Sequence, residues 1–168
     1  MLFRSLSRME SGIIAVHSED TTITQMLESI QQQFNVKVRE KNITLSLCDT
    51  DLHVRCDPKW TVEAIGNIVD NAIKYTACGG NVQVKAEQNS FFVKIDIIDD
   101  GIGIEKEEIP KIFGRFYRSL SVADQPGVGI GLFLAREIIQ AQKGYIKVTS
   151  ERGKCSIFSV FLPISKKE

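Results

Sequence analysis

The segment Asn67-Ile-Val-Asp-Asn71-Ala-Ile-Lys74-Tyr75 lies inside a predicted helix that has clear start and stop signals. Asp57-Pro58 starts this helix, because aspartate caps a helix N-terminus and proline fits the first turn. Cys78-Gly79-Gly80 ends it near residue 76. Asn67 and Asn71 are four residues apart, so their side chains share one face. Asparagine is unfavourable in the middle of a helix, and two on one face therefore indicate a function.

The side chains of this helix face predict a site for a magnesium nucleotide. Mg²⁺ prefers oxygen ligands that it shares with phosphates and water, so Asn71 is the predicted magnesium ligand. Asn67, one turn away, would hold a metal-bound water or face the phosphoryl group. Lys74 can reach a phosphate as a point charge, and Tyr75 offers an aromatic wall near the base or ribose. The alternatives are a cation that suits the helix C-terminus for Lys74, and a core aromatic for Tyr75.

A second segment, Asp99-Asp-Gly101-Ile-Gly103-Ile104, follows a predicted strand. A carboxylate at this point can accept a hydrogen bond from the exocyclic amine of adenine, whereas the carbonyl of guanine would be repelled. The two glycines allow the backbone to pass close to a flat ring. The alternative is an ordinary turn opened by an aspartate pair.

A third segment, Gly127-Val128-Gly129-Ile-Gly131-Leu132, precedes a predicted helix and suits phosphate oxygens. Its spacing is GxGxG without a preceding strand, which argues against a dinucleotide fold, and no Gly-Lys-Ser/Thr of a P-loop occurs. The polar stretch 119–127 is predicted to be a lid. Arg118 at its base either contacts phosphate or is a solvated surface arginine, and the sequence favours neither.

The composition bounds the class of protein. The chain has 168 residues, of which 43% are hydrophobic and 25% charged, as in one globular domain. Lysine plus arginine equals aspartate plus glutamate at 21 each, which argues against a nucleic-acid partner. The four cysteines form no CxxC pair and suggest free thiols in a cytoplasmic protein. No apolar run approaches the roughly 20 residues that span a bilayer, so no membrane contact is expected.

The hydrophobic pattern predicts an α/β fold. Predicted helices cover 22–38 (capped by Asp20 or Thr21), 57–76, 105–113 and 129–142. Predicted strands cover 13–16, 43–47, 82–87, 91–98, 145–150 and 155–162. Because the elements mix without strict βαβ alternation, we expect a two-layer sandwich, with a single mixed sheet of about five strands backed by three helices.

Together with Ile112-Phe113-Gly-Arg-Phe116-Tyr117-Arg118, the three segments resemble the N, G1, F and G2 boxes of sensor histidine kinases. These boxes define the catalytic ATP-binding domain (HATPase_c) of the GHKL or Bergerat-fold superfamily. The resemblance extends from about Ser7 to Ile164. Its pattern Asp-x-Gly-x-Gly aligns on Asp99, which implies that Asp99, rather than Asp100, recognises the base. It implies a remnant of a dimerisation helix or linker at 1–12, the catalytic domain at 13–164, and a tail at 165–168.

The resemblance implies that the chain binds ATP with Mg²⁺ and donates the γ-phosphoryl to a histidine for relay to a response regulator. That histidine would lie on the helical dimerisation and phosphotransfer domain of the parent protein, because neither His17 nor His53 has the family's phospho-acceptor pattern. The fragment is therefore expected to be a monomer that cannot autophosphorylate alone. The implied catalytic residues are Asn67, Asn71, Lys74 and Arg118. The implied nucleotide-binding residues also include Tyr75, Asp99, Gly101, Gly103, Ile104, Gly127, Val128, Gly129, Gly131 and Leu132.

Two rivals to this interpretation stay open. Hydrolytic members of the superfamily place a glutamate four residues before the metal-binding asparagine, but here that position is Asn67, which cannot take a proton. We therefore expect slow ATP hydrolysis and a preference for a supplied nucleophile.

The alternatives to the histidine kinase interpretation are a serine kinase of the anti-sigma-factor type, and a nucleotide-sensing docking module without transfer. Cys155 replaces a glycine that the family often has in its last turn.

Overall fold

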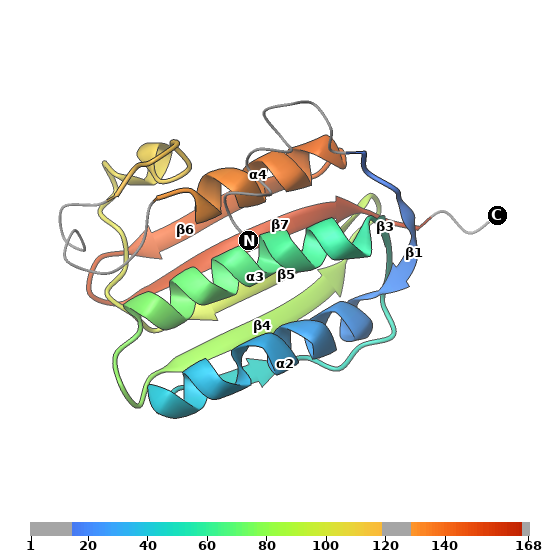
Figure 1. Ribbon diagram of the computed structural model, residues 1–168. Helices are drawn as coiled ribbons and strands as arrows, with labels where there is room; N and C mark the ends of the chain where they lie inside the picture. The colour runs from blue at the N-terminus through green and yellow to red at the C-terminus, as the bar shows by residue number, and fades with distance from the viewer. Residues whose placement is uncertain (1–14, 119–128, 166–168) are drawn as a thin grey trace.

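Three helices cover one face of a five-stranded sheet in the computed structural model, which describes residues 15–118 and 129–165 (Figure 1). The helices are α2 (Ile23–Glu40), α3 (Pro58–Tyr75) and α4 (Gly131–Ala141). The strands, in sheet order, are β2 (Thr44–Leu47), β4 (Asn81–Gln88), β5 (Phe92–Asp99), β7 (Cys155–Pro163) and β6 (Tyr145–Glu151). The predicted α/β sandwich with a mixed sheet is confirmed.

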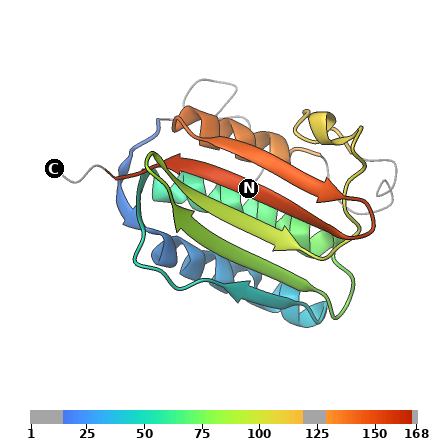
Figure 2. The same ribbon diagram turned by 180° about the vertical axis from the view of Figure 1, so that it is seen from behind.

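The sheet is mixed because only one of its strand pairs is parallel. Strand β2 pairs with β4 in parallel, and every other neighbouring pair is antiparallel. Seen from behind, the strands lie in front of the helices, and no helix of the described residues covers this second face (Figure 2). The helices therefore have to supply one wall of any site between the two layers.

The prediction of a single sheet was wrong, because a second sheet of two short strands lies where the chain enters the fold. Strand β1 (Glu19–Thr22) pairs antiparallel with β3 (His53–Cys56). The strand predicted at 13–16 is also wrong for residues 15 and 16, which lie outside any strand, while 13 and 14 lie outside the described residues. The sequence Glu-Asp-Thr-Thr of β1 has no apolar alternation, so the hydrophobic pattern could not reveal a strand that is held mainly by its partner.

The start of α3 is as predicted, whereas the start of α2 is not. Asp57 caps α3: its Oδ1 accepts hydrogen bonds from the backbone N–H of Lys59 (3.1 Å) and Trp60 (3.2 Å). The cap of α2 is Thr22, whose hydroxyl accepts from the N–H of Gln25 at 3.3 Å. The predicted caps Asp20 and Thr21 instead belong to β1 and pair with β3, so the helix begins one or two residues later.

The helix predicted over 105–113 is wrong. This segment contains only the short 3₁₀ helix η1 (Ile109–Lys111), within a series of tight turns. The N–H groups of Glu108, Lys111 and Gly114 each bond to the carbonyl three residues earlier. Pro110 lacks an N–H and would clash with a carbonyl one turn earlier in a longer α-helix. The acidic residues of the segment match a helix start, but the proline prevents the helix from continuing.

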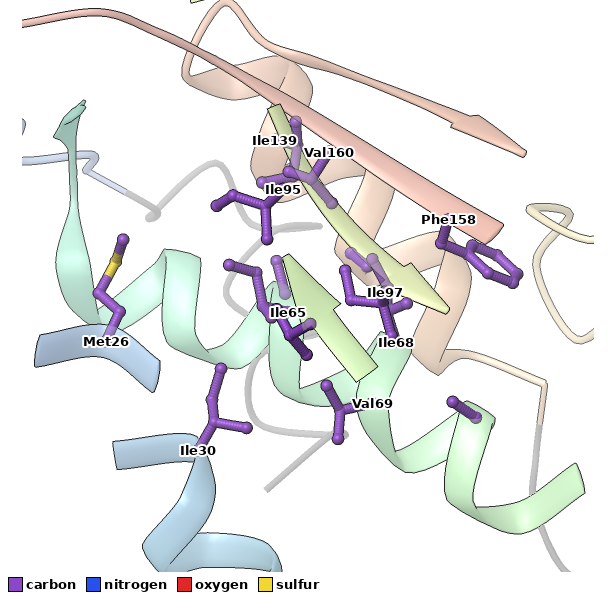
Figure 3. Packing of buried hydrophobic residues seen from close by; sticks show 14 of the residues in the cluster. Met26, Ile30, Ile65, Ile68, Val69, Ile95, Ile97, Ile139, Phe158 and Val160 are labelled. Carbon is purple, nitrogen blue, oxygen red and sulfur yellow. The ribbon is translucent and has the colours of Figure 1, made fainter. Parts of the chain in front are cut away.

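The core lies between the helices and the sheet (Figure 3). Helix α2 contributes residues at helical spacing, as predicted, and β5 and β7 contribute every second residue. Labelled members of this cluster are Met26, Ile30, Ile65, Ile68, Val69, Ile95, Ile97, Ile139, Phe158 and Val160. Four free thiols lie among the described residues, and no helix there is long and apolar enough to cross a membrane.

A buried polar cluster fixes α4 against the start of α3. The side-chain oxygen of Gln142, just after α4, accepts from the N–H of Asp57 at 2.6 Å, and its nitrogen donates to the hydroxyl of Thr61 at 3.0 Å. Gln142 and Thr61 are both buried, and both the oxygen and the nitrogen of the Gln142 amide have a hydrogen-bond partner. The far ends of the same two helices line the cavity described next.

Candidate nucleotide site

A cavity of about 240 Å³ lies between α3, the segment after β5 and the start of α4. Most of the residues predicted for the nucleotide site line this cavity: Asn67, Asn71, Lys74, Tyr75, Asp99, Gly103, Ile104, Arg118, Gly129, Gly131 and Leu132. Gly101 is not among the lining residues, and Gly127 and Val128 lie outside the described residues. Segments far apart in the sequence thus meet at one place, although the role of each residue stays a prediction.

Helix α3 presents amide and cationic groups to the cavity. The side-chain nitrogen of Asn67 is buried and has no hydrogen-bond partner among the described residues. An unpaired buried donor is costly, so this nitrogen fits a site that receives an acceptor from outside the chain, such as a phosphate oxygen or a water. Asn71 and Lys74 follow on the same face and bring an amide group and a cationic group to the cavity wall.

Asp99 brings a carboxyl group to the cavity wall from the sheet. It is the last residue of β5, its side chain is buried, and its Oδ1 accepts from the N–H of Gly101 at 2.9 Å. Burial raises the pKa of Asp99 to about 6, which the bond from Gly101 only partly opposes. The neighbouring Asp100 does not line the cavity: it accepts from the N–H (2.8 Å) and side-chain nitrogen (2.9 Å) of Asn81.

The glycines after Asp99 are required by backbone packing. At Gly101, a Cβ atom would lie 2.5 Å from the carbonyl oxygen of Tyr75. Gly103 has a φ of +70°, and a Cβ atom there would lie 2.1 Å from the carbonyl oxygen of Glu151. Side chains at these positions would push the segment away from α3 and from the β6–β7 turn. The glycines therefore shape the cavity wall, whether or not a flat ring lies against them.

The start of α4 and Arg118 form the cationic side of the cavity. Helix α4 begins at Gly131, and no side chain in the described part of the chain caps its first N–H groups. Such uncapped N–H groups suit an anion. Gly129 has a φ of +72°, and a Cβ atom there would lie 2.6 Å from the carbonyl oxygen of Tyr117. Burial raises the pKa of Tyr75, and the positive charge of Arg118, which also lines the cavity, opposes this shift.

Sequence reasoning missed several lining residues: Asp70, Ile102, Glu108, Ile112, Tyr117, Ile130, Arg152, Ser156 and Phe158. The Tyr117 hydroxyl donates to Glu108 Oε1 at 2.9 Å. Ser156 is buried and pairs with Asp99 in the β5–β7 register. The sequence around Ser156 carries no signal for this position, because only the pairing of two strands that are distant along the chain brings it opposite Asp99.

The comparison with known families agrees with this geometry. The family described as "Histidine kinase-, DNA gyrase B-, and HSP90-like ATPase" matches residues 56–166, which include every residue that lines the cavity. The chain belongs to this family. Use of ATP follows from that membership, and the predicted family is confirmed.

Among curated proteins, sensor histidine kinase WalK of Bacillus subtilis is 30% identical over 168 residues, which cover 97% of this chain and 28% of WalK. The adaptive-response sensory kinase SasA of Synechococcus elongatus is 32% identical, over 94% of this chain and 42% of SasA. The chain thus spans less than half the length of either relative.

Among solved structures, the mycobacterial sensor histidine kinase MprB matches with a TM-score of 0.78 and 25% identity. The match covers 90% of this chain and all of the MprB chain. The HATPase_c domain of this chain is therefore an ATP-binding catalytic domain of the sensor histidine kinase type.

Proposed function

We propose that this domain binds ATP with Mg²⁺ and donates the γ-phosphoryl to a histidine on a separate helical domain of the parent protein. The observation that carries the proposal is one cavity with a buried carboxylate, Asp99, at one end and an unpaired buried amide, Asn67, on its helical wall. An adenine amine suits the first group, and phosphate or water oxygen suits the second.

The donor set of the cavity fits Mg²⁺ with phosphates. Asn71 would contribute an amide oxygen, and Mg²⁺ typically completes its shell with phosphate oxygens and waters. When bound, the ion would neutralise phosphate charge as the phosphoryl group is transferred. The phosphates would be bound and oriented by Lys74, Arg118 and the first N–H groups of α4. Asp99 would fix the position of the base by accepting a hydrogen bond from the adenine amine.

We further propose that hydrolysis by water is slow. Asn67 cannot act as a general base, and besides Asp99 the two carboxylates that line the cavity among the described residues already have partners. Asp70 forms an ion pair with Lys37 of α2, and Glu108 accepts the hydroxyl of Tyr117. A supplied histidine would therefore compete well with water for the phosphoryl group.

The remaining parts of the proposal concern the parent protein. We infer that residues 1–12 continue a dimerisation helix or linker, that the catalytic domain spans 13–164, and that 165–168 form a tail. The phosphoryl group would pass from the histidine to a response regulator. The parent would present this domain in the cytoplasm, and the isolated domain would be a monomer.

Incubation with γ-labelled ATP and a helical histidine domain from a sensor kinase tests the proposal. We expect magnesium-dependent ATP binding by calorimetry and acid-labile, base-stable label on the histidine domain. The variant Asn71→Ala should bind ATP with the same affinity with and without Mg²⁺.

Three results would contradict the proposal in different ways. Acid-stable label on serine would favour the serine kinase. Nucleotide binding without transfer to any supplied histidine domain would favour the docking module. A magnesium effect that persists in Asn71→Ala would remove Asn71 as the ligand.

A further inference from the structure

The C-terminal end of α3 is held by groups outside the helix. The last four carbonyls of any α-helix have no partner within it. In α3, the carbonyl of Ala72 accepts from the N–H (3.1 Å) and hydroxyl (2.7 Å) of Thr76. The carbonyl of Tyr75 accepts from the N–H of Ile102 at 3.3 Å. Two carbonyls remain between them, those of Ile73 and Lys74.

A single lysine from another helix binds both of these carbonyls. Lys41 directly follows α2, and its Nζ donates to the carbonyl of Ile73 at 2.8 Å and to that of Lys74 at 2.7 Å. Its side chain is half-buried, and desolvation lowers the pKa of Lys41. A cation at a helix C-terminus also interacts favourably with the helix dipole. The ammonium group thus joins the ends of two helices at one point.

The backbone next to Lys41 strengthens the same junction. The carbonyl of Asn42 accepts from the N–H of Gly79, at 2.9 Å, in the turn that follows α3. Lys37, one turn earlier on α2, also reaches α3, but it binds the side chain of Asp70 and no backbone group of the helix end. Lys41 is therefore the side chain that fixes the last turn of α3, from which Lys74 and Tyr75 enter the cavity.

We propose that Lys41 is a positioning residue of the nucleotide site: it holds the last turn of α3 so that Lys74 and Tyr75 face the nucleotide, without touching the nucleotide itself. The proposal rests on the proposed function, because it assigns Lys74 to the phosphates. It follows from the bonds to the two carbonyls, since a loose last turn would let both side chains turn away from the cavity.

A double-mutant cycle tests this inference by calorimetry with ATP and Mg²⁺. We expect Lys41→Met to weaken binding about tenfold in the wild-type background, and about twofold or less in the Lys74→Met background. Lys41→Arg should stay within about threefold of wild type, because a guanidinium can also donate to two adjacent carbonyls. Lys94→Met, which removes a lysine and its ion pairs to Glu87 and Asp96 on the uncovered face of the sheet, should bind like wild type.

Hydrogen exchange separates a positioning role from a general loss of stability. In Lys41→Met we expect faster exchange at the amides of residues 73–76, with the strands of the sheet protected as in wild type. Full affinity in Lys41→Met, equal losses in both backgrounds of the cycle, or uniformly faster exchange would each overturn the inference. Failure of the proposed function looks different, because the wild-type chain itself would then show no magnesium-dependent ATP binding.

Discussion

At the scale of single residues, Asp99 and Asp100 show how position decides the chemistry of a carboxyl group. Asp99 is buried in the cavity wall, and burial raises its pKa to about 6. Asp100 is exposed, and hydrogen bonds from Asn81 lower its pKa. The sequence placed the two side by side, and the family pattern indicated Asp99. Asp99 lines the cavity and Asp100 does not, while recognition of the base by Asp99 stays a prediction.

The raised pKa of Asp99 gives opposite pH dependences for stability and for binding. The folded pKa of about 6 lies above the ordinary value of 3.8, so the folded chain holds this proton over a range in which the unfolded chain has lost it. The contribution of Asp99 to stability is therefore full below about pH 4 and is lost as the pH rises through about 6. Adenine binding needs the carboxylate, and ATP affinity should rise over the same range.

Calorimetry with Asp99→Asn across about pH 5 to 8 checks this prediction. We expect about tenfold or greater loss of ATP affinity at the upper end and a flatter pH profile than that of wild type. Asp100→Asn is the matched control and should keep the wild-type profile. Titration of the ATP phosphates is common to all three proteins and cancels in the comparison. Superimposable profiles for wild type and Asp99→Asn would remove Asp99 from base recognition.

At the scale of elements, the sequence predicted those whose hydrophobic period is strong and missed those held by their partners. Helix α3 and strands β4 to β7 lie within two residues of their predicted bounds. Strand β1 has no apolar pattern of its own, and Pro110 prevents the helix predicted at 105–113. In the cavity wall, the α3 residues were predictable because helix spacing alone groups them. Arg152 and Ser156 were not, because only strand pairing brings them there.

Two glycines beside the β6–β7 turn allow a test of how that turn supports the segment after Asp99. Both have positive φ, +70° at Gly103 and +81° at Gly153, so alanine is strained at either position. A Cβ atom at Gly103 would lie 2.1 Å from a backbone oxygen, whereas one at Gly153 would have no atom within 4 Å. We expect Gly153→Ala to lower the free energy of unfolding by about 1 kcal/mol and Gly103→Ala by about 3 kcal/mol. Urea denaturation measures both, and equal losses would contradict the packing argument.

At the scale of the whole molecule, a two-layer arrangement with one covered sheet face could be predicted from the order of the elements. The second, two-stranded sheet could not, because both of its strands have only four residues and β1 has no apolar alternation. Only the three-dimensional structure shows that Gln142 joins the end of α4 to the start of α3. This buried junction sets the two helices against each other at one end, and the cavity opens between their other ends.

The pairing of Asp99 with Ser156 has a consequence for how the chain folds. Asp99 of β5 and Ser156 of β7 both line the cavity, and the two strands are distant in sequence. Such pairings form late because a long loop must close first. The cavity is therefore incomplete until β5 and β7 have paired. In stopped-flow experiments, ATP with Mg²⁺ should therefore slow unfolding and leave the refolding rate unchanged. Faster refolding with nucleotide would mean that β5 and β7 pair early. We expect instead that the nucleotide stabilises the native state without assisting its formation.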